Sequence, residues 1–380
     1  MNNEKSRRLI KRYLQGTATP EEDALLETWY LEAAEQQQDV PGEPNYAVIE
    51  EEILQSLRKT QIKPIRLWPR IAVAASVTIA ISFGAYFLLV KDKKPVQVVY
   101  NAESVKPVQN GVTLTLSNGQ KVDLDQSHRG RRKVADGTSI AQSANVLSYE
   151  NSEPATGGPL THTLTNNSAT RFGLTLADGT VVYLDVASSI TYPTSFTGGD
   201  RLVKVTGQAY FKVIHNKAKP FRVEAGNEMV EDIGTEFNVD AYNDAPLKTT
   251  LLQGAVMISI DGQSKNNLTL KPGQQAILTG RVLTEANANV EVVTAWLQGK
   301  IIFYHETLES VLTRVARIYD VKFVWESNDL RKIKMIGVVS RTRTLAGVLN
   351  FFKKTGEVDF IMEGKTIRVI KRNKYNPITN

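Results

Sequence analysis

The feature that most constrains this chain is an unbroken run of twenty uncharged, mostly apolar residues from Ile71 to Val90. At about 1.5 Å of rise per residue, a helix of this length spans roughly 30 Å, the thickness of the hydrocarbon core of a bilayer. Charged residues flank the run, with Arg70 before it and Lys91 after it. A buried core helix would normally keep a polar stripe, and this run has none. The sequence therefore predicts one transmembrane helix over residues 71–90.

The position of the apolar run within the chain bears on its role. A cleaved signal peptide has a short basic leader and a shorter apolar core, whereas this run follows seventy residues of charged sequence. We therefore expect a permanent membrane anchor. Five Lys and Arg residues lie close before the run and three lie just after it, a modest excess that favours a cytoplasmic N-terminus under the positive-inside rule.

Composition excludes several classes of function. The net charge is +6, but the Lys and Arg residues form no dense stripe interleaved with aromatics, so we expect no direct contact with nucleic acid. The chain has no cysteine, which excludes disulfides, thiol catalysis and Cys-zinc sites. No histidine lies at metal-ligand spacing from another, and we expect neither a metal nor a cofactor. The four histidines are His128, His162, His215 and His305.

Residues 1–67 show the periodicity of short amphipathic helices. The stretch Thr19 to Glu22 is a capping box with proline at the first helical position, which predicts that a second helix starts there. A domain of this size is marginal alone, so its apolar stripes either close into a small bundle or are buried on a partner. We favour a helical docking segment that buries them on another protein. The stripes of the first two helices contain Leu9, Tyr13, Leu25, Leu26, Trp29 and Tyr30.

Residues 96–295 alternate between apolar and polar side chains and are punctuated by Asn-Gly, Asp-Gly and Gly-Gly pairs. This pattern predicts an all-β domain. A repeat occurs at a spacing of sixty, where Leu114 to Asp125 and Leu174 to Asp185 match at seven of twelve positions. Each copy has the form of a β-hairpin.

The register of the two hairpins follows from parity. A three-residue loop places Leu114 opposite Val122 in the first copy and Leu174 opposite Val182 in the second, so that apolar residues share one face. Such a loop closes with a residue in the left-handed conformation, which favours glycine. The residues at this position are Gly119 and Gly179.

Several blocks in this region, in their order and spacing, resemble the FecR family. These blocks include Leu176 to Leu184, Ser188 to Pro193, Val205 to Val213, Lys219 to Val223, Ile233 to Val239 and Leu270 to Ala276. The chain departs from the family pattern at three places. The family usually has Glu where Gln208 stands, Asn where Asp185 stands, and often a Thr-Pro-Arg-Gly stretch where this chain reads Asn167 to Arg171.

Residues 296–372 change to a mixed pattern of helices and strands. Two helix–strand units align without gaps at a shift of 37, so that Thr307-Leu308 corresponds to Thr344-Leu345. This predicts a tandem βαβ repeat, with two helices on one face of a small α+β sheet. The region resembles the secretin and TonB N-terminal type of domain that often ends FecR-like proteins of Bacteroidetes type. It is either a partner-binding module with an exposed sheet edge or a packing cap for the β domain.

No sequence motif of a hydrolase, a zinc peptidase or a dinucleotide-binding domain is present, and we expect no enzyme that acts on other molecules. The pair Gly234-Thr235 is one exception. In some FecR-like proteins the corresponding pair is a site of self-cleavage, in which the threonine hydroxyl attacks the preceding carbonyl. The alternative, which we favour, is that Gly234 permits a tight turn before a strand over Thr235 to Val239.

Together these features predict a multi-domain protein with a helical N-terminal segment, one transmembrane helix, an all-β domain and a small α+β module. The resemblance implies a transmembrane anti-sigma factor of the bacterial inner membrane, with its N-terminus cytoplasmic and its C-terminus periplasmic. Its partners would be an extracytoplasmic-function sigma factor, held by the N-terminal stripes, and the signalling domain of an outer-membrane TonB-dependent transducer. The alternative is a membrane-tethered periplasmic β domain that binds a glycan or another envelope component. A face with clustered aromatics would favour it, but Tyr183, Tyr192 and Tyr210 are equally explained as core residues.

Overall fold

The computed structural model describes residue 102 and residues 105–372, except 110, 125–128, 150–158 and 233. The helices predicted in residues 1–67 and the transmembrane helix predicted over residues 71–90 lie outside this part of the chain. Within it, no helix is both long enough and apolar enough to cross a membrane. The described residues are mostly β-strand with few helices, as the sequence predicts for residues 96–295.

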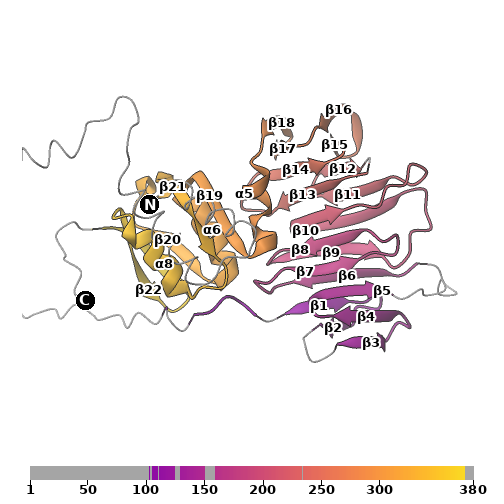
Figure 1. Ribbon diagram of the computed structural model, residues 1–380, viewed down its shortest axis with the longest axis horizontal. Helices are drawn as coiled ribbons and strands as arrows, with labels where there is room; N and C mark the ends of the chain where they lie inside the picture. The colour runs from indigo at the N-terminus through magenta and orange to yellow at the C-terminus, as the bar shows by residue number, and fades with distance from the viewer. Residues whose placement is uncertain are drawn as a thin grey trace, which may run out of the picture. The chain divides into compact units, whose positions relative to one another are not determined.

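Eighteen strands between residues 112 and 287 form the β domain, in which two sheets share the strand β10 (Figure 1). The first sheet contains, in order, β2 (Lys121–Asp123), β1 (Val112–Thr115), β6 (Thr161–Asn166), β9 (Ser188–Pro193), β10 (Arg201–Lys212), β11 (Phe221–Ala225), β12 (Glu228–Asp232), β15 (Val256–Ile260) and β16 (Gln263–Leu270). The second contains β3 (Gly130–Lys133), β4 (Ser139–Ser143), β5 (Val146–Tyr149), β7 (Phe172–Thr175), β8 (Val181–Leu184), then β10, β13 (Glu236–Ala241), β14 (Leu247–Gln253), β17 (Gln274–Thr279) and β18 (Val282–Asn287).

Strand β10 passes from the first sheet to the second at Gly207. Before this residue the strand pairs with β9 and β11, and from it onward the strand pairs with β13 and β8. Gly207 has φ +76°, and a Cβ atom there would lie 2.4 Å from Ser188 Oγ. Only glycine therefore fits the crossing, because any side chain would be strained and would clash with β9.

The hydrophobic core of the β domain lies between the two sheets. It combines side chains such as Leu164 and Ile190 of the first sheet with Leu174 and Val182 of the second, and all four are fully buried. The alternation seen in the sequence places every second residue on this inner face. Full burial of each such aliphatic side chain contributes about 1.5–3 kcal/mol. Phe211 and Phe237 stack at a centroid distance of 4.9 Å where β10 pairs with β13.

Both predicted hairpins are confirmed. Leu114 pairs with Val122 and Leu174 pairs with Val182. Their loop glycines take the left-handed conformation, with φ values of +81° and +84° for Gly119 and Gly179 respectively. The two copies nevertheless lie in different sheets, since β1–β2 belongs to the first and β7–β8 to the second.

Residues 290–372 form the C-terminal module. Its elements are α5 (Val290–Thr294), the 3₁₀ helix η3 (Ala295–Gln298), β19 (Lys300–Thr307), α6 (Leu308–Tyr319), β20 (Lys322–Trp325), α7 (Asn328–Lys332), β21 (Lys334–Ser340), α8 (Leu345–Lys354), β22 (Val358–Glu363) and β23 (Thr366–Lys371). The repeat at a shift of 37 is visible in the helix starts. The hydroxyls of Thr307 and Thr344 accept the backbone N–H groups of Ser310 and Gly347, each at 3.3 Å, and so cap α6 and α8.

The prediction of a single small sheet in this module is wrong. Strands β19 and β21 form one antiparallel sheet, and β20, β23 and β22 form a second. Strand β19 therefore pairs with β21, its counterpart in the second repeat, whereas β20 and its counterpart β22 both pair with β23, which lies outside the aligned units. The buried face of α6 contacts strands of both sheets. A sequence repeat indicates where strands lie, but it does not determine which strands pair. The pairing depends on which strands pack against the apolar faces of α6 and α8, and here strands of both sheets pack against each helix.

One titratable group is buried in the β domain without full compensation. Glu228, at the start of β12, is 1% exposed, and Thr249 donates a hydrogen bond to its Oε1. Its Oε2 has no hydrogen-bond partner within the described part of the chain. Burial raises the pKa of the Glu228 carboxyl to about 7, and the hydrogen bond from Thr249 opposes that rise. The charged carboxylate thus destabilises the fold.

We predict that Glu228→Gln makes a fragment of residues 96–380 less sensitive to pH. Because the folded-state pKa is raised, the parent loses stability as the pH rises from about 4.5 to about 7, by up to about 3 kcal/mol. The variant lacks this loss and is the more stable protein at pH 8. Urea unfolding across this range measures the effect, with Glu231→Gln on the same strand as the control. An unchanged pH slope in Glu228→Gln would contradict the assignment.

Candidate functional site

The residues predicted to bind a sigma factor, Leu9, Tyr13, Leu25, Leu26, Trp29 and Tyr30, lie outside the described residues. The structure therefore leaves their role as a prediction. The other predicted site pair, Gly234-Thr235, is described, and so are the three positions at which the chain departs from the FecR pattern.

Gly234 lies in the turn that leads into β13. Its φ is +95°, and a Cβ atom at this position would lie 2.6 Å from His215 Nδ1. The carbonyl oxygen of Gly234 is also closely approached, since a Cβ atom on Gly254 would lie 2.5 Å from it. The turn conformation and the close packing explain the glycine by themselves.

Thr235 and Asp232 are joined by a hydrogen bond in the same turn. The threonine hydroxyl donates to Asp232 Oδ1, and both residues are buried. Burial raises the pKa of the Asp232 carboxyl, and the hydrogen bond from Thr235 opposes that rise. The turn thus holds a hydroxyl beside a carboxylate that can accept its proton, next to the Gly234 peptide bond.

A group of interacting charged residues lies at the junction between the β domain and the C-terminal module. Acidic residues come from the β domain, and arginines come from the module. The acidic residues are Asp185, Asp240 and Asp244, and the arginines are Arg314, Arg317 and Arg341. All described residues belong to one compact unit, so these contacts lie within a single body. The junction is electrostatically complementary.

Asp185 and Arg341 form the buried ion pair of this junction. Asp185 follows β8, and Arg341 follows β21; Oδ1 of the aspartate lies 2.7 Å from Nη1 of the arginine. Both side chains are less than a tenth exposed, at 7% and 5% respectively. Asp185 Oδ1 also accepts the backbone N–H of Val186 at 2.7 Å. Neither Arg341 Nη1 nor Nε has an aligned hydrogen bond within the described residues, so charge rather than directed hydrogen bonding holds this guanidinium.

Arg317 makes the second charged contact. Its guanidinium lies over the ring of Tyr242 at 3.7 Å and forms an ion pair with Asp244. Asp240 is half-buried nearby; desolvation raises the pKa of its carboxyl, and the charge of Arg317 opposes that rise. The module thus places one arginine over an aromatic face and between carboxyl groups of the β domain.

Three further hydrogen bonds complete the junction. Trp296 of η3 donates from Nε1 to Asn238 Oδ1 at 3.1 Å, and Gln208 Nε2 donates to the same oxygen at 3.3 Å. Arg171, just before β7, donates to the backbone carbonyl of Leu297.

All three departures from the FecR pattern lie at this junction. Asp185 pairs with Arg341, Gln208 shares the acceptor of Trp296, and Arg171 reaches Leu297. The sequence identifies these positions as unusual, but it gives no sign that they meet, because their partners lie far along the chain. The one signal in the sequence was the negative charge at Asp185, where the family usually has a neutral residue, because a buried charge requires a partner of opposite charge.

The segment Val105 to Gln109, which we call the strap, precedes β1 and is hydrogen-bonded to both the β domain and the C-terminal module. The carbonyl of Val105 accepts the N–H of Leu345 at 2.9 Å, and the N–H of Val108 donates to the carbonyl of Ile318 at 2.9 Å. The carbonyl of Val108 accepts the N–H of Ala169 in the β domain at 2.7 Å. The strap is therefore bonded to the C-terminal end of α6, to the N-terminal end of α8 and to the β domain.

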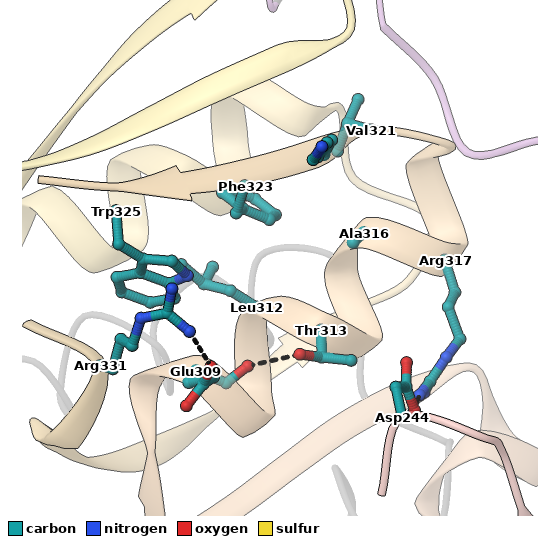
Figure 2. Close-up of a pocket in the computed structure, with 11 residues that line it drawn as sticks. Asp244, Glu309, Leu312, Thr313, Ala316, Arg317, Val321, Phe323, Trp325 and Arg331 are labelled. Atoms are coloured by element: carbon teal, nitrogen blue, oxygen red, sulfur yellow. Dashed lines mark hydrogen bonds and ion pairs between the residues drawn. The ribbon is translucent and has the colours of Figure 1, made fainter. Parts of the chain in front are cut away.

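A groove of about 410 Å³ lies beside α6 and β20 (Figure 2). Phe323 and Trp325 line it, and Figure 2 shows the indole of Trp325 beside the guanidinium of Arg331, which bonds Glu309 at 2.6 Å. Asp244 of the β domain also lines it, so both parts contribute. Strand β20 is an edge strand of its sheet and borders this groove.

A largely buried cluster of polar side chains in the β domain resembles a catalytic triad. His162 is fully buried, with Nε2 2.6 Å from Asp136 and Nδ1 2.7 Å from the hydroxyl of Tyr149, which lies 2.8 Å from that of Tyr192. His162 and Tyr192 are buried, Asp136 and Tyr149 are half-buried, and the four side chains satisfy one another's polar groups, so we assign the network a packing role. Within the described residues no three His, Asp or Glu side chains gather as a metal site would require.

The three tyrosines weighed for a glycan-binding face do not form one exposed patch. Tyr183 and Tyr210 pair across β8 and β10 with ring centres 6.4 Å apart, whereas Tyr192 lies in β9 of the other sheet. Tyr192 is 1% exposed within the polar network, and Tyr210 is buried with its hydroxyl donating to Glu236 at 2.5 Å. Tyr183 is partly covered by Arg171, whose guanidinium lies 5.0 Å from the ring centre. Two of the three are therefore core residues.

We predict that Asp185→Asn lowers the unfolding free energy of residues 96–380 by about 3 kcal/mol, because it leaves Arg341 buried without its counter-charge. Adding Arg341→Met should recover much of the loss, since an apolar side chain of similar length needs no partner. Urea unfolding of the two single variants and the double variant gives the coupling energy. Strictly additive effects would show that the two side chains do not interact.

Two FecR regions coincide with the two parts described above. The family profile described as FecR protein matches residues 162–257, within the β domain. The profile described as FecR, C-terminal matches residues 300–369, which run from β19 into β23 of the module. No curated protein matches the chain.

Solved structures give a consistent result. Crystal structures at 2.50 Å and 1.65 Å of a proposed anti-sigma factor from Parabacteroides distasonis are 29% identical to this chain, with a TM-score of 0.51. In each case the matched region covers 56% of this chain. It covers 100% of the solved chain in the 2.50 Å structure and 99% in the 1.65 Å structure. The two family regions, in the order expected from the motif blocks, and this likeness together identify the chain as a member of the FecR family.

Proposed function

We propose that the chain is a single-pass transmembrane anti-sigma factor of the bacterial inner membrane. Residues 1–67 hold an extracytoplasmic-function sigma factor in the cytoplasm, and the residues after 90 lie in the periplasm. Two findings support this: the FecR regions, and the likeness to a protein described as an anti-sigma factor. The observation that carries it is the order of the parts in the sequence, with predicted amphipathic helices on one side of an apolar run and the FecR regions on the other.

The C-terminal module is the proposed receiver of the signal from an outer-membrane TonB-dependent transducer. Strand β20 is a sheet edge, and the backbone groups of such an edge pair readily with a strand of another protein. The adjoining groove offers Phe323 and Trp325 to the side chains of that strand. These features support a contact in which the transducer's signalling domain adds a strand to β20.

The proposed function predicts that residues 1–67 alone bind the cognate sigma factor. Trp29→Ala combined with Leu25→Ala should weaken binding by about 2 kcal/mol or more, because both side chains belong to the apolar stripe of one predicted helix. Calorimetry measures the affinity, circular dichroism verifies that the helices remain, and Glu27→Ala is the control. Equal affinities with intact helices would refute the docking segment.

The turn at Gly234-Thr235 supports a second, separate activity, which is self-cleavage. The Thr235 hydroxyl oxygen attacks the Gly234 carbonyl carbon and its proton passes to Asp232. Asp232 then gives this proton to the amide nitrogen as the C–N bond breaks, so that the nitrogen leaves as the free amine of Thr235. This forms an ester that water hydrolyses to a new C-terminus at Gly234 and a new N-terminus at Thr235. The hydrogen bond from Thr235 to buried Asp232 is the observation that favours it.

If the turn is reactive, the purified protein will contain two fragments that remain associated, since β12 and β13 on either side of the bond are both paired within sheets. Mass spectrometry should find Thr235 as an N-terminus. Thr235→Ala should abolish the fragments, Thr235→Ser should keep them, and Asp232→Asn should slow their formation by about 10²-fold or more. A single intact chain in the parent protein, after prolonged incubation, would leave the turn a purely structural one.

A further inference from the structure

We propose that the docked C-terminal module is a latch on the strap, and that undocking the module frees the strap for proteolysis. The inference rests on the proposed function, because that function places the strap between the membrane helix and the periplasmic domains. The strap comprises Val105, Lys106, Pro107, Val108 and Gln109.

The hydrogen bonds of the strap depend on the module. Three backbone hydrogen bonds join the strap to residues far along the sequence. Two of them go to the module, namely to Ile318 at the end of α6 and to Leu345 at the start of α8. The remaining bond goes to Ala169 of the β domain. A strap held only by Ala169 would be an exposed, extended segment, which is the kind of chain that proteases accept.

The junction is built to separate without unfolding either part. Every residue of the fully buried core cluster of the β domain lies between Leu114 and Ala276, and no module residue belongs to it. The contacts across the junction include ion pairs and hydrogen bonds, such as Asp185–Arg341 and Trp296–Asn238, and Trp296 is the large apolar side chain that the module buries there. Charged groups that separate regain hydration, so undocking costs far less than exposing an apolar core.

The partner groove connects to the latch through Arg317. This residue lines the groove and forms the junction contact with Asp244 and Tyr242. The next residue, Ile318, supplies the carbonyl that accepts the N–H of Val108 in the strap. A strand that enters the groove must therefore compete for a residue that helps to hold the module in place, one position from the strap bond.

Hydrogen exchange tests the inference in the full chain, held in detergent micelles. The parent should protect the amides of Val108 and Leu345. Asp185→Asn removes the negative charge that pairs with Arg341 across the junction, and it should raise the exchange rates of these two amides by about tenfold or more. Arg201→Gln is the matched control, since Arg201 forms a buried ion pair with Asp178 wholly inside the β domain; it should leave the strap protected.

Trp296→Phe is the second variant, because it removes only the indole hydrogen bond to Asn238 and retains the ring. It should also accelerate strap exchange while β22 and β23 stay protected, which separates undocking from unfolding of the module. Thermolysin should then cleave the strap faster in both latch variants than in the parent and the control. Strap exchange and cleavage unchanged in both latch variants, or raised equally in Arg201→Gln, would overturn the latch. If the parent fragment of residues 1–67 failed to bind a sigma factor, the proposed function would be refuted, but the hydrogen-exchange result on the strap would be unaffected.

Discussion

The crossing of β10 from one sheet to the other is the constraint on which the rest of the structure depends. Gly207 allows the strand to pair with β9 and β11 before the crossing and with β8 and β13 after it, so one strand fixes both layers around the core. The crossing also positions the junction. The carbonyl of Gln208 accepts the N–H of Asp185 at 3.0 Å, so two junction residues are held by the backbone of the crossing strand itself.

Local features of the fold could be predicted from the sequence because each depends on neighbouring residues. The hairpin pairs Leu114–Val122 and Leu174–Val182 follow from alternation and a loop glycine, and the caps at Thr307 and Thr344 follow from a repeat of 37. The strand pairing of the C-terminal module could not be predicted, since it depends on how α6 and α8 are covered rather than on any local pattern.

The junction lies between these two cases. Family resemblance marks Asp185, Gln208 and the stretch before Phe172 as unusual, and the charge at 185 calls for a partner. Arg341 lies in a different part of the chain, and no periodicity relates the two positions. Long-range ion pairs of this kind depend on the docking of two finished folds. The candidate site was therefore visible in the sequence only as three separate anomalies.

The geometry of the strap has a mechanical consequence. Its bonds are spaced along the chain, with one at Val105 and two at Val108, rather than side by side as in a ladder between strands. A pull from the N-terminal side therefore loads the Val105 bond first and the Val108 bonds afterwards. Bonds that break in sequence resist a much smaller force than bonds that share it. The two sheets of the β domain, by contrast, hold each strand with several bonds at once, so tension along the chain would peel the strap while the sheets remained intact.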